Sequence, residues 1–276
     1  MSVINTNVSA LYSQNAMKTN ARAMSTAMEQ LSTGTRVNSA KDDAAGLAIG
    51  QNMTSQIRGL NQAVRNVNDG INMMQTAEGA MVEQSNMLQR MRELAVQAMN
   101  GTYSDVQRSY LDKEFQQLTQ QIGQIATDTM WNDQRLLDGT GGLSGKFTYQ
   151  AGQGSGQTIS VTVGEMTVTG LFSGATPSIA SGVAAAASLD VISQALEKIN
   201  LQRAEIGAGI NRMAYAADNL TNIASNQTQS RSSIMDTDYA LATTQLAKTQ
   251  IIQQAATAML AQANQQPQGV MALLKG

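Results

Sequence analysis

The sequence predicts a mainly α protein, in which long antiparallel helices form a rod or coiled coil with a small β-hairpin region. Three observations support this class. Apolar residues recur at steps of three and four over most of the chain, which is the period of an amphipathic helix. Pro177 and Pro267 are the only prolines, so long helices can run without interruption. Alternating and glycine-rich sequence is confined to the middle of the chain.

The first predicted helix covers about residues 3–33. Its apolar stripe advances by four, three, four and three residues through Met17, Ala21, Met24, Met28 and Leu31. The polar, turn-rich residues 33–40 end this pattern. Asp42 and Asp43 follow at the start of the next predicted helix, where carboxylates are favourable because of the helix dipole.

The next two helices are predicted to be antiparallel neighbours. One covers residues 46–100 and would be about 80 Å long at about 1.5 Å per residue. Within it, Gly59, Gly70 and Gly79 each cost about 1 kcal/mol relative to alanine. The other covers about residues 104–128, and the short connection between the two favours an antiparallel pair.

The middle of the chain has the pattern of strands and loops. Residues 146–150 and 158–163 predict a hairpin, because apolar and polar residues alternate in the second of these segments. Residues 166–169 predict a further short strand. Residues 170–181 are expected to form a loop.

Helices return in the last third of the chain, over about residues 184–231 and 236–264. Pro267 is expected to stop the last helix. The stripe of this helix is Ile252, Ala255, Met259 and Ala263, and the apolar residues beyond the proline are Val270, Leu273 and Leu274.

The two terminal stripes are narrow, and much of their apolar surface comes from Met and Ala. Isolated helices of this kind bury too little surface to offset the loss of chain entropy. We therefore expect both termini to be disordered in the monomer and to become ordered against partner helices. A chain whose two ends both need partner helices is expected to assemble rather than to catalyse.

Composition argues against several classes of function. Charged residues are 14% of the 276-residue chain and the net charge is −2, so neither nucleic acid nor a membrane is an expected partner. Cysteine and histidine are absent, which removes thiolate nucleophiles and the commonest general base and metal ligand. Gly152 and Gly154, like Gly207 and Gly209, lack the full fingerprint of a phosphate-binding loop. We expect no enzyme activity, no cofactor and no metal.

The start of the sequence gives an expectation about export. Residues 1–11 have no basic region followed by an apolar one, so a cleaved secretory signal is not expected. No stretch approaches about 18 consecutive apolar residues, so a membrane-spanning segment is not expected either. Export by a route without a cleaved signal is compatible with both observations.

Both ends of the chain closely resemble bacterial flagellin. The N-terminal text that carries the resemblance is residues 4–7, 31–34, 38–49, 66–70 and 89–97. The C-terminal text is residues 230–240 and 250–265. With the helices between these segments, the resemblance covers about residues 1–140 and 185–276.

The resemblance implies an exported structural protein that polymerises into the flagellar filament for motility. It implies that residues 1–44 and 233–276 pair as the coiled-coil core of the filament. Residues 45–170 and 185–232 would form a helical rod with a hairpin near 146–169, and a short loop at 171–184 would replace the large outer domains of many flagellins. The expected self-assembly residues are Met17, Met24, Met28, Leu31, Ile252, Met259, Leu273 and Leu274.

The resemblance also implies partners and a location. The family is exported through the flagellar type III apparatus without a cleaved signal, so the expected location is the bacterial flagellum, outside the cell. A dedicated chaperone would hold residues 234–274 before export, and filament cap and junction proteins would contact the subunits. Toll-like receptor 5, a vertebrate innate receptor, binds many flagellins, and the residues matching that surface are Gln89, Arg90, Leu94 and Glu114.

Two alternatives to a filament subunit stay open at this point. A hook–filament junction protein would have similar ends, although the text at 89–97 and 236–240 favours flagellin. A secreted coiled-coil adhesin or effector would share the periodicity but not the matching text. An enzyme is the weakest interpretation, because no group of residues pairs a nucleophile with a base.

Overall fold

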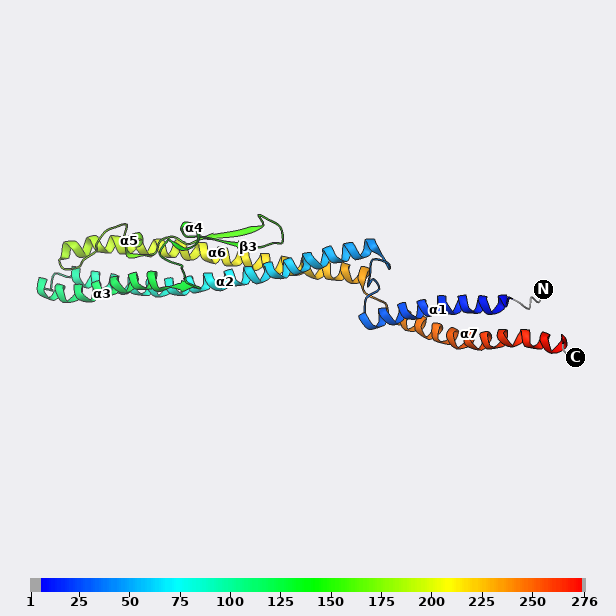
Figure 1. Ribbon diagram of the computed structural model, residues 1–276. Helices are drawn as coiled ribbons and strands as arrows, with labels where there is room; N and C mark the ends of the chain where they lie inside the picture. The colour runs from blue at the N-terminus through cyan, green and yellow to red at the C-terminus, as the bar shows by residue number, and fades with distance from the viewer. Residues whose placement is uncertain (1–5, 275–276) are drawn as a thin grey trace. The chain divides into compact units, whose positions relative to one another are not determined.

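The computed structural model describes the backbone of residues 6–274 and the side chains of residues 6–265. The chain divides into two compact units, which are described separately (Figure 1). The terminal unit combines Met1–Ile57 with Ser225–Gly276, and the central unit is Arg58–Ala224. Two long helices, α2 (Ala44–Met99) and α6 (Gly182–Met235), have residues in both units.

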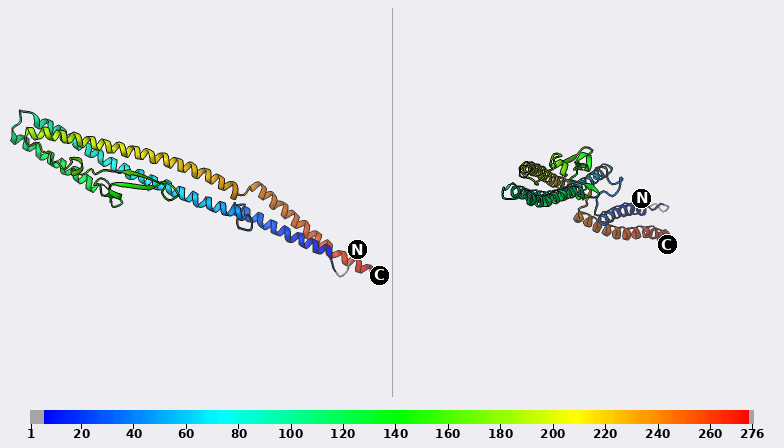
Figure 2. Two further views of the ribbon diagram at one scale, coloured as in Figure 1. Left: turned by 90° about the horizontal axis from the view of Figure 1, so that it is seen from above. Right: turned by 90° about the vertical axis from the view of Figure 1, so that its left-hand side faces the viewer.

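In the terminal unit, α1 (Val8–Thr33) lies antiparallel beside α7 (Tyr239–Leu274), as Figures 1 and 2 both show. The side-chain oxygen of Asn7 caps α1 by accepting a hydrogen bond from the N–H of Ala10. Gly34 ends α1 in the left-handed conformation, with a φ of 71°. The predicted break in the helical pattern is therefore a glycine C-cap.

In the central unit, α2 and α6 run beside α3 (Asp105–Asp128), which begins with a capping box between Ser104 and Gln107 (Figure 2). The core lies between the inner faces of these helices. Its fully buried helical residues include Met74, Met81, Leu88, Met91, Phe115, Ile122, Ile192, Ile199, Ile206 and Met213. Most of them are separated by steps of three, four or seven, as in the predicted stripes, and the mainly α class is confirmed.

The predicted hairpin is confirmed in the central unit. It consists of β3 (Lys146–Gln150) and β4 (Thr158–Thr162), which pair antiparallel with Phe147 opposite Val161. Both of these side chains and that of Ile159 are buried, so one face of the hairpin belongs to the core.

Several short elements differ from the predictions. Those that the sequence did not predict are β1 (Met130–Trp131), its antiparallel partner β2 (Gln134–Arg135), and α4 (Gly141–Ser144). The strand predicted at residues 166–169 is wrong, because this segment enters the short helix α5 (Val168–Leu171). Thr167 caps α5, since its side-chain oxygen accepts a hydrogen bond from the N–H of Gly170.

The prediction that Pro267 stops the last helix is also wrong, because α7 continues to Leu274. Proline removes one intrahelical hydrogen bond and costs about 3 kcal/mol, but the residues after it are free to continue the helix. The side chains of Leu273 and Leu274 lie outside the described residues.

Two helix glycines form notches that receive the hairpin. A Cβ atom at Gly70 of α2 would lie 2.8 Å from the ring of Tyr149, and one at Gly209 of α6 would lie 2.8 Å from a methyl carbon of Val161. Because these positions have no side chain, the hairpin approaches both helices closely. Gly70 lowers the helix propensity of α2, but packing requires a glycine there because a side chain would collide with Tyr149.

Two polar side chains of α6 hold the segment that follows the hairpin. The buried amide of Gln202 donates to the carbonyl of Thr162 at 2.8 Å and accepts from the N–H of Gly164 at 2.9 Å. The ammonium group of Lys198 donates to the carbonyl of Gly170 at 2.7 Å, near the end of α5. These contacts satisfy backbone groups that have no partner in a helix or strand.

Candidate functional site

The seam between α1 and α7 is narrow and consists mainly of small side chains. The buried residues of α1 are Ala10, Asn20 and Ala27, and those in the described part of α7 are Ala242, Thr249 and Ala263. The larger seam residues are only half-buried, namely Met17, Met24, Leu31, Leu246 and Leu260. Such a seam removes little apolar surface from water, so the pair gains little stability by itself.

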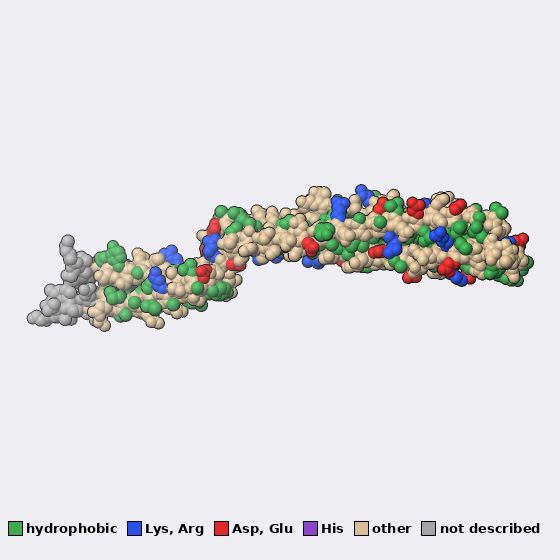
Figure 3. All heavy atoms as spheres, turned by 180° about the vertical axis from the view of Figure 1, so that it is seen from behind, with side chains coloured by type: hydrophobic (Ala, Val, Ile, Leu, Met, Phe, Trp, Pro, Cys, Tyr) green, Lys and Arg blue, Asp and Glu red, His purple; other side chains and the backbone are tan. Residues whose placement is uncertain are grey.

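The other faces of α1 and α7 carry exposed apolar side chains. Met28 is 53% exposed, Ile252 is 39% exposed and Met259 is 63% exposed. Other exposed members of this set, which we call the outer face, are Leu11, Tyr12, Tyr239, Leu241 and Ile251. Figure 3 shows hydrophobic side chains along this helix pair with few charged ones among them. An apolar surface of this kind is typical of an interaction site.

The structure distributes the predicted self-assembly residues between these two surfaces. Met17, Met24 and Leu31 lie at seam positions, whereas Met28, Ile252 and Met259 belong to the outer face. The seam of α7 runs through Leu246, Thr249, Gln253, Ala256 and Leu260, one residue beyond the expected Ile252, Ala255 and Met259, whereas Ala263 belongs to both the expected stripe and the seam.

The two segments that connect the helices of the terminal unit bind each other. Thr35 and Asp236 pair in an antiparallel bridge. The guanidinium group of Arg36 donates to the carbonyl of Ile234 at 2.7 Å, and its backbone N–H donates to the carbonyl of Met235. These carbonyls end α6, where donors and positive charge are favourable. Arg36 is thus a C-cap supplied from a distant part of the sequence.

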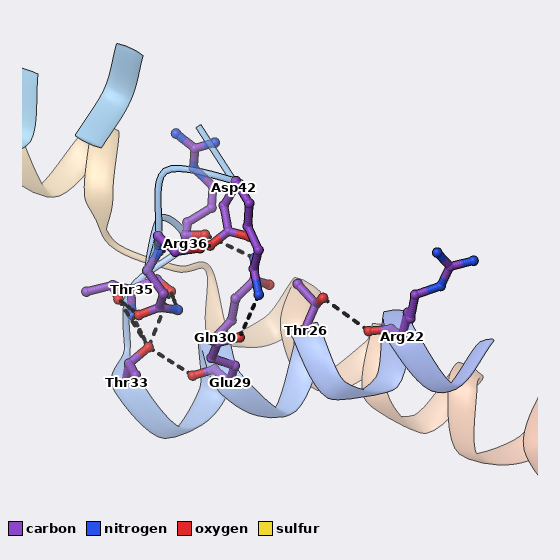
Figure 4. A network of polar contacts seen from close by, with 11 residues as sticks. Arg22, Thr26, Glu29, Gln30, Thr33, Thr35, Arg36 and Asp42 are labelled. Carbon is purple, nitrogen blue, oxygen red and sulfur yellow. Dashed lines mark hydrogen bonds and ion pairs between the residues drawn. The ribbon is translucent and has the colours of Figure 1, made fainter. Parts of the chain in front are cut away.

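Figure 4 shows Thr35, Arg36 and Asp42 together in the segment after α1. The carboxylate of Asp42 accepts hydrogen bonds from the hydroxyl and N–H of Ser39 and from the N–H of Asn38. The bond from the Ser39 hydroxyl, with the backbone donors, lowers the pKa of Asp42. Asp43 accepts from the N–H of Gly46 at 2.8 Å, which confirms the predicted helix start.

The predicted receptor-binding residues lie in the central unit, on α2 and α3. Arg90 of α2 donates to Glu93 at 2.9 Å and to Glu114 of α3 at 3.0 Å. The hydrogen bond to Glu93 raises the pKa of Arg90 most, and the hydrogen bond to Glu114 raises it further. Gln89 is exposed beside them, whereas Leu94 is only 1% exposed and packs in the core beneath this face.

An open groove of about 1090 Å³ runs between α2 and α6 on the central unit. Its lining carries charges of both signs, from Arg92, Glu93, Glu197 and Arg203. Among the described residues, no group of three or more acidic side chains is placed to hold a metal ion. No helix in the described part of the chain is long and apolar enough to cross a membrane.

Asn20, Thr249 and Arg36 were not predicted from the sequence. Asn20 and Thr249 continue the three-residue steps from Met17 and Leu246, so a count that included polar residues would have placed them in the seam. Arg36 offers no such signal, because the carbonyl that it caps is 198 residues away in the sequence.

Known proteins with similar sequences and structures are flagellar. Residues 4–141 match the bacterial flagellin N-terminal helical region, and residues 189–274 match the bacterial flagellin C-terminal helical region. The chain is 41% identical over 274 residues to a flagellin of Halalkalibacterium halodurans, across 99% of this chain and 100% of that protein.

Two solved structures extend the comparison. The crystal structure of Bacillus cereus flagellin, 31% identical, matches 59% of this chain and 94% of its own with a TM-score of 0.51. A putative flagellar hook-associated protein from Vibrio parahaemolyticus matches 71% of this chain and 100% of its own with a TM-score of 0.59. That protein is 14% identical, so the likeness concerns the fold alone.

Proposed function

Because this chain belongs to the bacterial flagellin family, we propose that it assembles by burying the outer face of α1 and α7 against other copies of itself. Flagellins are structural subunits of the flagellar filament, outside the cell, and they are not enzymes. The chain is accordingly a filament subunit that forms a homopolymer. The finer proposal concerns which residues drive that assembly.

The exposed outer face is the observation that carries the proposal. The seam covers only one side of each terminal helix, and Met28, Ile252 and Met259 remain in water. Fully burying a side chain of this size contributes roughly 1.5–3 kcal/mol. Since the same residues recur in every copy, this contribution is repeated at each subunit of a polymer and favours the assembled state.

We propose that the terminal segments 1–44 and 233–276 form the filament core and become ordered on assembly. The seam alone buries little apolar surface. In a monomer this burial does not offset the conformational entropy that is lost when the terminal helices become ordered. Amide exchange across residues 6–31 should be fast in dilute monomer and slow in filaments. Equal protection in the two states would contradict this proposal.

We propose for the rest of the chain that residues 45–170 and 185–232 form the rod, and that the loop at 171–184 stands in place of outer domains.

Seeded polymerisation, followed by electron microscopy, tests the role of the termini. The full chain should form long filaments. A chain lacking residues 1–31 should stay monomeric, while circular dichroism still reports folded helices in the central unit. Filaments formed by the truncated chain would show that α1 is not required, and persistent monomers of the intact chain would contradict the filament function.

We propose that residues 234–274 bind a flagellar export chaperone before the seam forms. Ile251, Ile252 and Met259 give this segment an apolar face that α1 leaves exposed, so it needs cover until the chain assembles. Calorimetric titration should detect binding of the chaperone to the full chain and none to a chain ending at residue 233. Retained binding would place the chaperone site elsewhere.

Filament cap and junction proteins would contact the same terminal helices at the two ends of the polymer.

We propose that Gln89, Arg90 and Glu114 form a contact surface for Toll-like receptor 5, with Leu94 supporting it from below. Arg90 is already paired with Glu114, but an exposed ion pair contributes only about 0–1 kcal/mol, so a receptor can displace it at low cost. Arg90→Ala should weaken signalling in reporter cells, whereas Arg65→Ala, an exposed change on the same helix, should not. Equal signalling by the two variants would remove Arg90 from the surface.

Leu94→Ala tests the supporting role separately. Leu94 is buried, so its truncation should lower both the melting temperature and receptor signalling. Lower stability with full signalling would show that the receptor surface does not depend on Leu94.

A further inference from the structure

Asn20 is a buried amide in the middle of the α1–α7 seam. It is 8% exposed, and the other buried residues of α1 are alanines. Its side-chain Nδ2 donates to the carbonyl of Thr249 at 2.7 Å and to Oε1 of Gln253 at 3.2 Å. A buried amide is destabilising unless it has such partners, so the surroundings of Asn20 restrict where it can lie.

A second asparagine, the residue that caps α1, makes a similar contact near the far end of the pair. Nδ2 of Asn7 donates to the carbonyl of Ala263 at 2.8 Å. Asn7 and Asn20 are separated by nearly the same length of helix as their acceptors Ala263 and Thr249, in antiparallel order. The bridge at Thr35 continues the same alignment at the other end. Polar contacts thus follow one register along the whole pair.

The apolar residues of the seam distinguish poorly between registers. Alanines and medium-sized side chains alternate on both helices, so sliding α7 by seven residues brings alanine, methionine and leucine together again. In the two registers shifted by seven, Asn20 meets Leu246 or Leu260 where it now meets Gln253. In either shifted register, the side chain of Gln253 also loses its hydrogen bond from Asn20. A polar residue in a helical seam specifies register in this way, at some cost in stability.

We propose that Asn20 sets the register of the α1–α7 pair through its hydrogen bond to the side chain of Gln253, whereas its bond to the backbone carbonyl of Thr249 satisfies the amide without selecting a register. It therefore determines which segment of α7 pairs with α1. This role lies in the seam within the terminal unit, and is distinct from that of the outer face, which we assign to contacts between copies.

Cysteine cross-linking in the full chain reports the register, because the chain has no cysteine of its own. Cysteines at Ala27 and Ala242, two buried seam positions, report the register of the structure. Cysteines at Met17 and Leu260 report a register shifted by seven residues, or about 10 Å along the helix. A disulfide forms only when the two Cα atoms are within about 7 Å, so each pair detects one register.

Both cysteine pairs are placed in the parent chain, in Asn20→Leu, and in Asn15→Leu as a control. Asn15 is exposed on the same helix, and leucine is close to asparagine in size. The pair should persist in Asn20→Leu, because leucine adds apolar surface to the seam. The cross-links are formed in seeded filaments, where the terminal helices are ordered.

The ratio of shifted to original cross-link should rise about tenfold in Asn20→Leu and stay at the parent value in Asn15→Leu. An unchanged ratio in Asn20→Leu would overturn the proposal. Failure of Asn20→Leu to polymerise, when Asn15→Leu does, would also overturn it, since Asn20 would then supply a contact that assembly itself requires.

Discussion

The ring of Tyr149 lies against the backbone of Gly70, so that a Cβ atom at Gly70 would come within 2.8 Å of ring atom Cδ1. The hydroxyl of Tyr149 donates to the sulfur of Met73 at 3.3 Å, one turn further along α2. This contact joins the hairpin to the helix. A glycine that lowers helix propensity is therefore the residue that lets β3 pack on α2.

Replacing Gly70 and Gly79 by alanine should have opposite effects on stability. Both glycines lie inside α2, and both substitutions gain up to about 1 kcal/mol in helix propensity. At Gly79 a Cβ would meet nothing within 4 Å, so Gly79→Ala should stabilise the protein. Gly70→Ala should destabilise it by about 1–3 kcal/mol, because the ring of Tyr149 must move. Urea unfolding measures both, and stabilisation by both changes would contradict the notch.

Tyr149 should titrate later than a tyrosine in an unfolded chain. Burial raises its pKa to about 12, whereas tyrosine in an unfolded chain ionises near pH ~10. The folded state therefore holds this proton more tightly, so stability is full below about pH 10 and falls as pH rises through the folded pKa. Ultraviolet titration should show a late step that Tyr149→Phe removes. A titration curve that Tyr149→Phe leaves unchanged above pH ~10 would contradict this.

Gln202→Leu should destabilise the central unit by about 1–3 kcal/mol. The change removes two part-buried hydrogen bonds, so the carbonyl of Thr162 and the N–H of Gly164 lose their partner. Gln194→Leu, on an exposed position of α6, should change stability by no more than about 0.5 kcal/mol. Thermal unfolding of the two variants provides the comparison, and equal melting temperatures would show that Gln202 does not hold the hairpin.

Arg36→Met should loosen the joined connecting segments of the terminal unit. The carbonyl of Ile234 loses a charged donor, worth about 1 kcal/mol at an exposed site. Exchange of the amide of Thr237, which donates to Gly34 across the bridge, should become roughly fivefold faster. Arg22→Met is the control on the exposed side of α1. The same exchange rate in parent and Arg36→Met filaments would show that the cap is not needed.

Sequence periodicity predicted the long helices well, because each needs a continuous apolar face. The faces of the central helices follow this period, and residues such as Met81 and Leu88 are large and fully buried. The seam of α7 includes Ala263 of the expected stripe but otherwise lies one position beyond it. Ile252 and Met259 are larger than the alanines beside them and dominate the pattern, although they are exposed. Periodicity therefore reports that a face is apolar, but not which partner covers it.

The remaining differences concern contacts that no local pattern records. The short helix α5 depends on the cap at Thr167 and on Lys198 from α6, so its sequence alone resembled a strand. The value of Gly70 became visible only when Tyr149 was placed over it. Such features depend on residues far apart in the sequence.

The critical concentration for polymerisation, measured on the double variant Ile252→Gln and Met259→Gln, tests the central claim most directly. Both side chains belong to the outer face, so glutamine should leave the α1–α7 seam and the central unit as they are. If assembly buries these residues, the subunit concentration left in the supernatant of seeded filaments should rise at least tenfold, or about 1.4 kcal/mol. A critical concentration equal to that of the parent chain would contradict the claim that the outer face drives assembly.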